Sequence, residues 1–277
     1  MRAASPCHAG LVPSSPPSPA ALLADAVRRE PAAPLVTHYD DATGERTELS
    51  ATTLANWVAK TANLLQDEYD VGPGSTVAVA LPVHWQTAAV LLGAWSCGAA
   101  VLDTAAEDDD RLARADVALT TQDRVEALEE AGAGELMGLS LHPLGLGMRN
   151  YVGEARDYAL EVRVHGDHFQ PYQPVDPAGP GLLLGGLELT LGGLAETAAE
   201  LAGRLGLVAG DRLLVDADTA AHAGPVAWLL APLAAGASVV LCRHPFPERL
   251  AARAAQERVT ATLGLQVEGV RELGRPS

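Results

Sequence analysis

The stretch that decides the fold runs from Val71 to Ala105 and reads VGPGSTVAVALPVHWQTAAVLLGAWSCGAAVLDTA. Its opening turn leads into Ser75–Pro82, whose continuous Val, Ala and Leu character is typical of a strand buried on both faces. His84–Cys97 is apolar and stops at Gly98, which predicts a helix, and the following AAVLD predicts another strand. A strand, a helix and a strand in this order favour a parallel βαβ unit.

The same alternation of strands and helices continues outward in both directions. Before the central stretch, Ser18–Pro31 and Ser50–Tyr69 each begin with a capping serine and repeat apolar residues at helical spacing, and PLVTHYD between them predicts a strand. Towards the C-terminus, ELTLGGLAETAAELAGRLGL predicts a helix and GDRLLVDA a strand, and further helices and strands follow. We therefore expect an α/β protein with mainly parallel sheets.

Less regular sequence separates two such series. YALEVRVHGDHF, which begins at Tyr158, alternates polar and apolar residues and predicts an edge or antiparallel strand. Five prolines in residues 1–19 argue against a signal peptide and predict a disordered tail. We expect a first α/β lobe at 20–140, an irregular connection at 141–178, and a partial second lobe at 179–277.

Composition limits the kinds of partner. The formal net charge is −16, aromatic residues make up 4% of the 277 residues, and Lys60 is the single lysine. A nucleic-acid surface needs clustered Lys and Arg, so we expect no nucleic-acid partner. Residues 223–242 carry no charge, but Pro225, Pro232 and Gly236 interrupt them, so we expect a helix, a turn and a buried strand there and no membrane span.

The cysteine and histidine patterns give no metal site. Cys7, Cys97 and Cys242 are far apart and not arranged as CxxC, which favours neither a zinc site nor a disulfide framework and fits a reducing cytoplasm. In the sequence HGDH, His165 and His168 would point to opposite faces of a strand, a poor arrangement for one metal ion. We therefore expect no metal ligands.

One glycine-rich stretch raises the question of nucleotide binding. Asp176–Gly193 reads DPAGPGLLLGGLELTLGG and opens onto a helix-like segment, as a phosphate-binding loop would. It contains no lysine, its one hydroxyl belongs to Thr190, and it matches neither GK[ST] nor a strand–GxGxxG–helix unit. The residues alone favour a structural glycine turn.

The order of segments resembles the N-terminal part of the adenylate-forming superfamily, which includes acyl- and aryl-CoA synthetases, peptide-synthetase adenylation domains and luciferases. The resemblance covers roughly residues 20 to 265 and implies two stacked αβαβα lobes, the second incomplete. The matching segments are ERTELSATTLANWVAKTANLL, the central stretch from Val71, ADVALTT, LAETAAELAGRLGLVAGDRLLV, and AHAGPVAWLLAPLAAGASVVLCRHPFPERLAARAAQERVTATLG.

The resemblance also suggests site residues. The family carries a Ser/Thr/Gly-rich loop with a lysine that holds ATP phosphates; here GPGLLLGGLELT stands in that place. Gly185, Gly186 and Thr190 are the expected remnants of this loop. His222 resembles the histidine of the family's aromatic-His segment, although Ala221 replaces the aromatic residue, and with Gly224 it is expected to line a substrate pocket.

The expected function depends on which of the family's ATP-binding and catalytic groups are missing from this sequence. The family's later Mg²⁺- and ribose-binding motifs and its C-terminal catalytic lysine have no match in this sequence, so nothing offsets the negative charge that develops when a carboxylate attacks ATP. We expect no catalytic residues, no cofactor, and neither ATP nor AMP binding.

Three readings of the function stay open. The first is a non-catalytic relative with a binding or interaction role, which self-associates or has a protein partner. The second is an acyl- or adenylate-binding subunit of an acid–thiol ligase completed by another polypeptide. The third is a decaying gene product.

Overall fold

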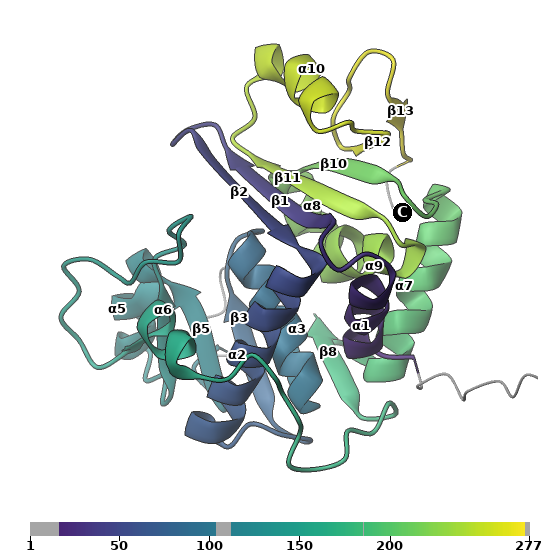
Figure 1. Cartoon of the computed structure of the whole chain (residues 1–277). Coiled ribbons are helices and arrows are strands. Elements are labelled where there is room, and N and C mark those ends of the chain that lie inside the picture. Colours follow the sequence, from purple (N-terminus) through teal and green to yellow (C-terminus); the bar gives the residue numbers. More distant parts are fainter. Residues whose placement is uncertain (1–16, 104–111, 185, 275–277) are drawn as a thin grey trace, which may run out of the picture.

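The computed structural model describes residues 17–103, 112–184 and 186–274 and contains two sheets (Figure 1). In spatial order, the seven-stranded sheet contains β7 (Arg156–Asp157), β6 (Leu136–Leu139), β5 (Val117–Thr121), β3 (Thr76–Ala80), β4 (Ala100–Asp103), β8 (Pro180–Leu184) and β9 (Leu187–Thr190). The six-stranded sheet contains β13 (Arg271–Glu272), β12 (Ala261–Leu263), β10 (Arg212–Asp216), β11 (Ser238–Arg243), β1 (Pro34–Asp40) and β2 (Glu45–Ser50).

Helices lie between and around these sheets. The α-helices are α1 (Pro19–Arg29), α2 (Ala51–Tyr69), α3 (Trp85–Cys97), α5 (Val125–Glu130), α6 (Tyr158–Glu161), α7 (Leu191–Leu205), α8 (Ala217–Pro225), α9 (Ala231–Ala235) and α10 (Pro247–Gln256). Shorter segments are the 3₁₀ turns η1 (Gln122–Arg124) and η2 (Val162–Val164) and the π-helical turn η3 (Val226–Leu230). Among the described residues, no helix is both long and apolar enough to cross a membrane.

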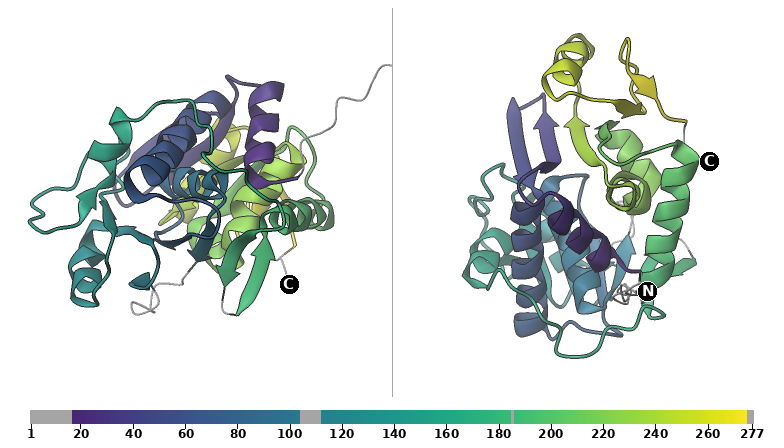
Figure 2. Two further views of the ribbon diagram at one scale, coloured as in Figure 1. Left: turned by 90° about the horizontal axis from the view of Figure 1, so that it is seen from below. Right: turned by 45° about the vertical axis from the view of Figure 1, so that its right-hand side comes forward.

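The predicted α/β architecture with mainly parallel strands is confirmed. Among the described strands, every pairing is parallel except in the hairpins β1–β2 and β8–β9. Helix α3 is buried on nearly all sides and contacts β1 of one sheet and β3 and β4 of the other. The largest hydrophobic cluster accordingly contains residues of both sheets, so one aliphatic core joins them. Figure 2 shows the β1–β2 hairpin, in purple to blue, beside the yellow-green strand β11.

The two sheets exchange segments along the chain. Strands β1 and β2 belong to the six-stranded sheet, because β1 pairs in parallel with β11 from Val36↔Val239 to Asp40↔Arg243. Strands β8 and β9 belong to the seven-stranded sheet through the pairing of β8 with β4. The ranges 20–140 and 179–277 therefore each contribute strands to both sheets.

Of the expected tail 1–19, residues 1–16 lie outside the described residues, and Ser18 caps α1.

Two local predictions are wrong. The segment from Tyr158 is helical (α6 and η2) because Asp157 caps it, its side chain accepting hydrogen bonds from the N–H groups of Ala159 and Leu160. The start of ELTLGGLAETAAELAGRLGL is strand β9, which pairs with β8; the helix begins only at Leu191, where Thr190 caps it. At both places, hydrogen bonds between residues close in sequence decided the secondary structure, against the pattern of polar and apolar residues.

Candidate functional site

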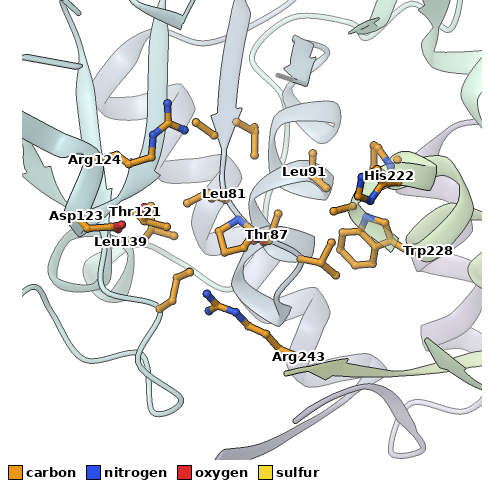
Figure 3. A pocket seen from close by; sticks show the side chains of 18 of the residues that line it. Leu81, Thr87, Leu91, Thr121, Asp123, Arg124, Leu139, His222, Trp228 and Arg243 are labelled. Atoms are coloured by element: carbon orange, nitrogen blue, oxygen red, sulfur yellow. Dashed lines mark hydrogen bonds between the residues drawn. The ribbon is translucent and has the colours of Figure 1, made fainter. Parts of the chain in front are cut away.

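A cavity of about 890 Å³, here called the main cavity, lies at the carboxyl ends of parallel strands from both sheets (Figure 3). The seven-stranded sheet contributes the residues that follow β3 and β5, and the six-stranded sheet contributes Arg243 at the end of β11. The chain runs from β3 to β4 on one side and then crosses to β5 on the other, so the strand order reverses here. Open α/β sheets characteristically bind ligands at such a reversal.

The walls of the main cavity are largely apolar. Leu81, Leu91 and Trp228 lie on them (Figure 3), and Pro82 is held by the hydroxyl of Thr87, which donates to its carbonyl oxygen at 2.6 Å. Such walls with a few polar groups are typical of small-molecule sites.

Several polar residues at the cavity hold a loop. Ser140 Oγ donates to the carbonyl oxygen of Leu146, and Gln122 exchanges two hydrogen bonds with the backbone of Arg149. These contacts fix the segment that follows β6. The charged side chains of the lining are those of Arg124, Asp123 and Arg243, and His222 also lines the cavity.

Arg243 is placed to meet an anion. It reaches from the end of β11 into the cavity (Figure 3), and its Nη1 lies 3.9 Å from Oδ2 of Asp40. The other oxygen of Asp40 contacts His244 Nδ1 at 3.0 Å. This separation is longer than a charge-assisted N–H···O bond, which is usually shorter than 3 Å, so Asp40 is not hydrogen-bonded to Arg243.

The structure places His222 and Gly224, the predicted pocket residues, on the main cavity. His222 Nδ1 lies 2.7 Å from the carbonyl oxygen of Asp218, and because a carbonyl only accepts, this bond requires the proton on Nδ1. Gly224 has φ 76° and ψ 170°, a conformation essentially reserved for glycine, and interrupts α8 one residue before its end at Pro225. The break turns backbone into the cavity wall.

The predicted remnants of a phosphate loop form a hairpin. Leu184 pairs with Leu187, so two residues, of which Gly185 lies outside the described residues, connect β8 and β9. Gly186 has φ 91°, as tight hairpin turns often require. Thr190 Oγ1 accepts from the N–H of Gly193 at 3.0 Å and caps α7. The hairpin presents leucines on both sides of its turn.

Lys60, the single lysine, lies elsewhere. It sits on α2, and its Nζ donates to the carbonyl oxygen of His165 in the connection after η2. The two described cysteines are buried, which raises the pKa of Cys97 to about 12 and that of Cys242 to about 11. Within the described ranges, no three His, Cys, Asp or Glu side chains gather as metal ligands would.

A buried histidine pair was missed by the sequence reasoning. The rings of His38, on β1, and His84, which caps α3, are 4.4 Å apart between centroids. Both ring nitrogens of His38 and Nε2 of His84 lack a hydrogen-bond partner among the described residues. Burial lowers the pKa of His38 to about 4 and that of His84 well below its usual value. The lone histidines in the sequence gave no signal that β1 would bring them together.

Comparison with solved structures defines the class of fold. The protein superposes on the N-terminal domain of FACL13 from Mycobacterium tuberculosis with a TM-score of 0.70 at 12% identity, covering 89% of this chain and 62% of that one. A Brucella canis acyl-CoA synthetase gives 0.73 at 19% identity (92% and 49% covered), and the anthranilate CoA ligase AuaEII with anthranoyl-AMP gives 0.72 at 14% identity (89% and 49% covered). The fold is that of the N-terminal domain of adenylate-forming enzymes, and the chain spans about half to two thirds of their length.

A closer relative identifies the family. A Mycobacterium tuberculosis protein described as a TIGR03089 family protein is 48% identical over 252 residues, which cover 88% of this chain and 96% of that protein. The chain belongs to the TIGR03089 family. No family model matches it.

Proposed function

We propose that the protein is a non-catalytic relative of adenylate-forming enzymes whose role is to bind a small organic ligand in the main cavity. The observation that carries the proposal is the β8–β9 hairpin. Leucines and a two-residue turn stand where the resemblance expects hydroxyls and a lysine around ATP phosphates. Joining a carboxylate to a triphosphate requires donors or cations at the developing charge, and this hairpin supplies neither.

The fold around the missing loop supports a binding role. The main cavity lies at the carboxyl ends of the strands and has apolar walls, and its volume of about 890 Å³ is within the usual range for ligand sites. We place this role in the cytoplasm, because Cys97 and Cys242 are free thiols.

We expect the purified protein to release no pyrophosphate from Mg-ATP with any member of a panel of carboxylic acids. An acyl-CoA synthetase serves as the positive control of the assay. Thermal unfolding with the same acids, and with a non-hydrolysable acyl-adenylate analogue, tests binding; we expect at least one to raise the Tm while Mg-ATP does not. ATP turnover, or no stabilisation by any compound, would contradict the proposal.

A second function stays testable in the same experiment. The largely apolar walls of the main cavity suit the acyl part of an adenylate made with the help of another polypeptide. Saturable binding of the acyl-adenylate analogue alone, without binding of the free acids, would favour this ligase-subunit role.

We further propose that the protein self-associates or has a protein partner. The side chains of Leu144, Leu160 and Val164 are 75%, 60% and 84% exposed. Arg163 joins the two segments that carry them, because its Nη2 donates to the carbonyl oxygens of Leu144 and Gly145. Apolar patches on a surface commonly mark interfaces. Sedimentation velocity at micromolar concentration should show association, and a strictly monomeric profile would contradict self-association.

A further inference from the structure

A second cavity, of about 440 Å³, is lined mostly by leucines of the β8–β9 hairpin and of α7. We call it the leucine cavity. Six leucine side chains line it: Leu182, Leu184, Leu187, Leu189, Leu201 and Leu205. The register pairs Leu182 with Leu189 and Leu184 with Leu187. Because side chains two residues apart on a strand point to the same face, the four leucines of the hairpin share one face.

The tip of the hairpin is the least covered part of this apolar surface. Leu187 is 54% exposed and Leu184 is 39% exposed. Strand β9 is also the last strand of its sheet, so no other described strand lies along its outer edge. An apolar edge that stays open pairs readily with other chains, and proteins usually cover it.

The described part of the chain starts beside this hairpin. The backbone of Pro17 passes close to Gly192 at the start of α7, because a methyl group added to Gly192 would lie 3.7 Å from the carbonyl oxygen of Pro17. Helix α1, which follows Pro17, packs against α7 (Figure 1). Residues 1–16, here called the N-terminal segment, are therefore tethered near the end of β9 at Thr190.

The reach of the N-terminal segment matches the length of the hairpin. Leu11 lies six residues before Pro17. With prolines at positions 13 and 16, these residues span about 19 Å in the extended conformation that proline favours. Leu187 lies five residues before Gly192, which is at most about 17 Å along a strand. Leu11 can therefore reach the tip of the hairpin.

Charge favours this segment over a second copy of the protein as the cover. The N-terminal segment contains Arg2 and no acidic residue. The hairpin and α7 expose Glu188, Glu196 and Glu200. Two copies of a chain with a net charge of −16 repel each other where such acidic surfaces meet. A tethered segment also needs little affinity, because a short linker gives it an effective concentration on the order of millimolar.

We propose that the N-terminal segment folds back over the hairpin of its own chain, with the side chain of Leu11 in the leucine cavity against Leu187. The inference goes beyond the proposed function, which concerns a ligand of the main cavity. The segment covers the exposed leucines and the outer edge of β9. The leucine cavity is then an interaction surface that the protein itself occupies, and it becomes free for another partner only when the segment leaves.

A spin label on Cys7 of the full-length protein tests this placement. Cys97 and Cys242 are buried, so a nitroxide reagent modifies Cys7, four residues before Leu11. The NMR signals of leucine methyl groups then report which leucines lie near the label.

We expect the label to broaden the methyl signals of Leu184 and Leu187 several times more than those of Leu128. Leu128 is the internal control, because it lies on α5, which contacts β6 near the opposite end of the sheet from β9. Equal broadening of the hairpin leucines and Leu128 would overturn the proposal.

Two pairs of variants test the contact itself. Leu11→Asn should lower the equilibrium constant for docking at least about tenfold, because a leucine side chain loses its burial, and the broadening at Leu184 should fall with it. Ala4→Asn should leave the broadening unchanged. Leu187→Asn should act like Leu11→Asn, whereas Leu160→Asn, at a leucine of similar exposure on α6, should have no effect. Broadening that survives Leu11→Asn would overturn the contact.

A mixing experiment separates the chain's own segment from that of a second copy. Spin-labelled protein without isotope labels is mixed with isotope-labelled Cys7→Ser protein, so broadening arises only between chains. We expect none at Leu187. Broadening there would show that the segment covers the hairpin of a second copy, and it would refute docking within one chain.

Discussion

Replacing Asp41 with alanine is expected to lower the free energy of unfolding by about 3–5 kcal/mol, the usual consequence of stranding a buried charge. Asp41 Oδ1 lies 2.6 Å from Nη2 of Arg253, and the two side chains are 3% and 6% exposed. Asp41 also accepts from the N–H of Phe246 at 2.8 Å and contacts Arg249 at 3.3 Å. Its loss leaves the guanidinium of Arg253 buried without its counter-ion and detaches the start of α10 from the β1–β2 turn.

Denaturation by urea measures this effect against two controls. Asp25→Ala removes an exposed pair with Arg28 on α1 and should change the free energy of unfolding by no more than about 1 kcal/mol. The double variant Asp41→Ala, Arg253→Met removes both buried charges and should recover much of the loss. Equal stability of Asp41→Ala and Asp25→Ala would mean that water reaches Arg253.

The protein should lose stability between pH 6.5 and pH 4 because of its buried histidine pair. Burial lowers the pKa of His38 to about 4, with Asp40 partly opposing and Arg243 adding to the shift. Above pH 6.5 neither the folded nor the unfolded state binds the proton. Below it the unfolded state does and the folded state does not, so stability falls by about 1.4 kcal/mol per pH unit, or about 3 kcal/mol in total by pH 4.

His84 adds to this loss, because burial and the neighbouring His38 lower its pKa in the same direction. Urea denaturation at a series of pH values measures the slope. His38→Phe keeps an apolar ring in the same space and should reduce the slope, whatever its effect on stability at pH 7. His168→Gln, at an exposed position, should leave the slope unchanged. An unchanged slope in His38→Phe would show that the pair is hydrated or already charged.

Much of the fold could be predicted because its strands and helices carry strong local signals. The strand β3 and the helix α3 follow directly from the apolar run after Ser75 and from the stop at Gly98, and the structure caps α3 there with a left-handed glycine. Which strand pairs with which could not be predicted in the same way. The pairing of β1 with β11 joins segments that are far apart in the sequence. Nothing in the sequence of either strand indicates which other strand it will pair with.

The candidate site was only partly predictable for the same reason. His222 and Gly224 were assigned to a pocket through the resemblance, and both line the main cavity. The position of Arg243 at the cavity could not be predicted, because an arginine at the end of a strand is common. It reaches the cavity only because the two sheets converge there. The sequence also did not predict that the leucines of the β8–β9 hairpin lie on one face, because this follows from the register in which β8 pairs with β9.

The pairing of β1 with β11 also has a consequence for the order of folding. During synthesis the β1–β2 hairpin leaves the ribosome long before β10 and β11 exist, and a two-stranded hairpin is marginally stable by itself. The seven-stranded sheet is also incomplete until β8 appears. Neither sheet can close from the N-terminal part of the chain alone, so the protein has a high contact order and should refold slowly for its size. Nascent chains that stop before β11 would expose the apolar strand β1, and such chains are natural clients for a chaperone.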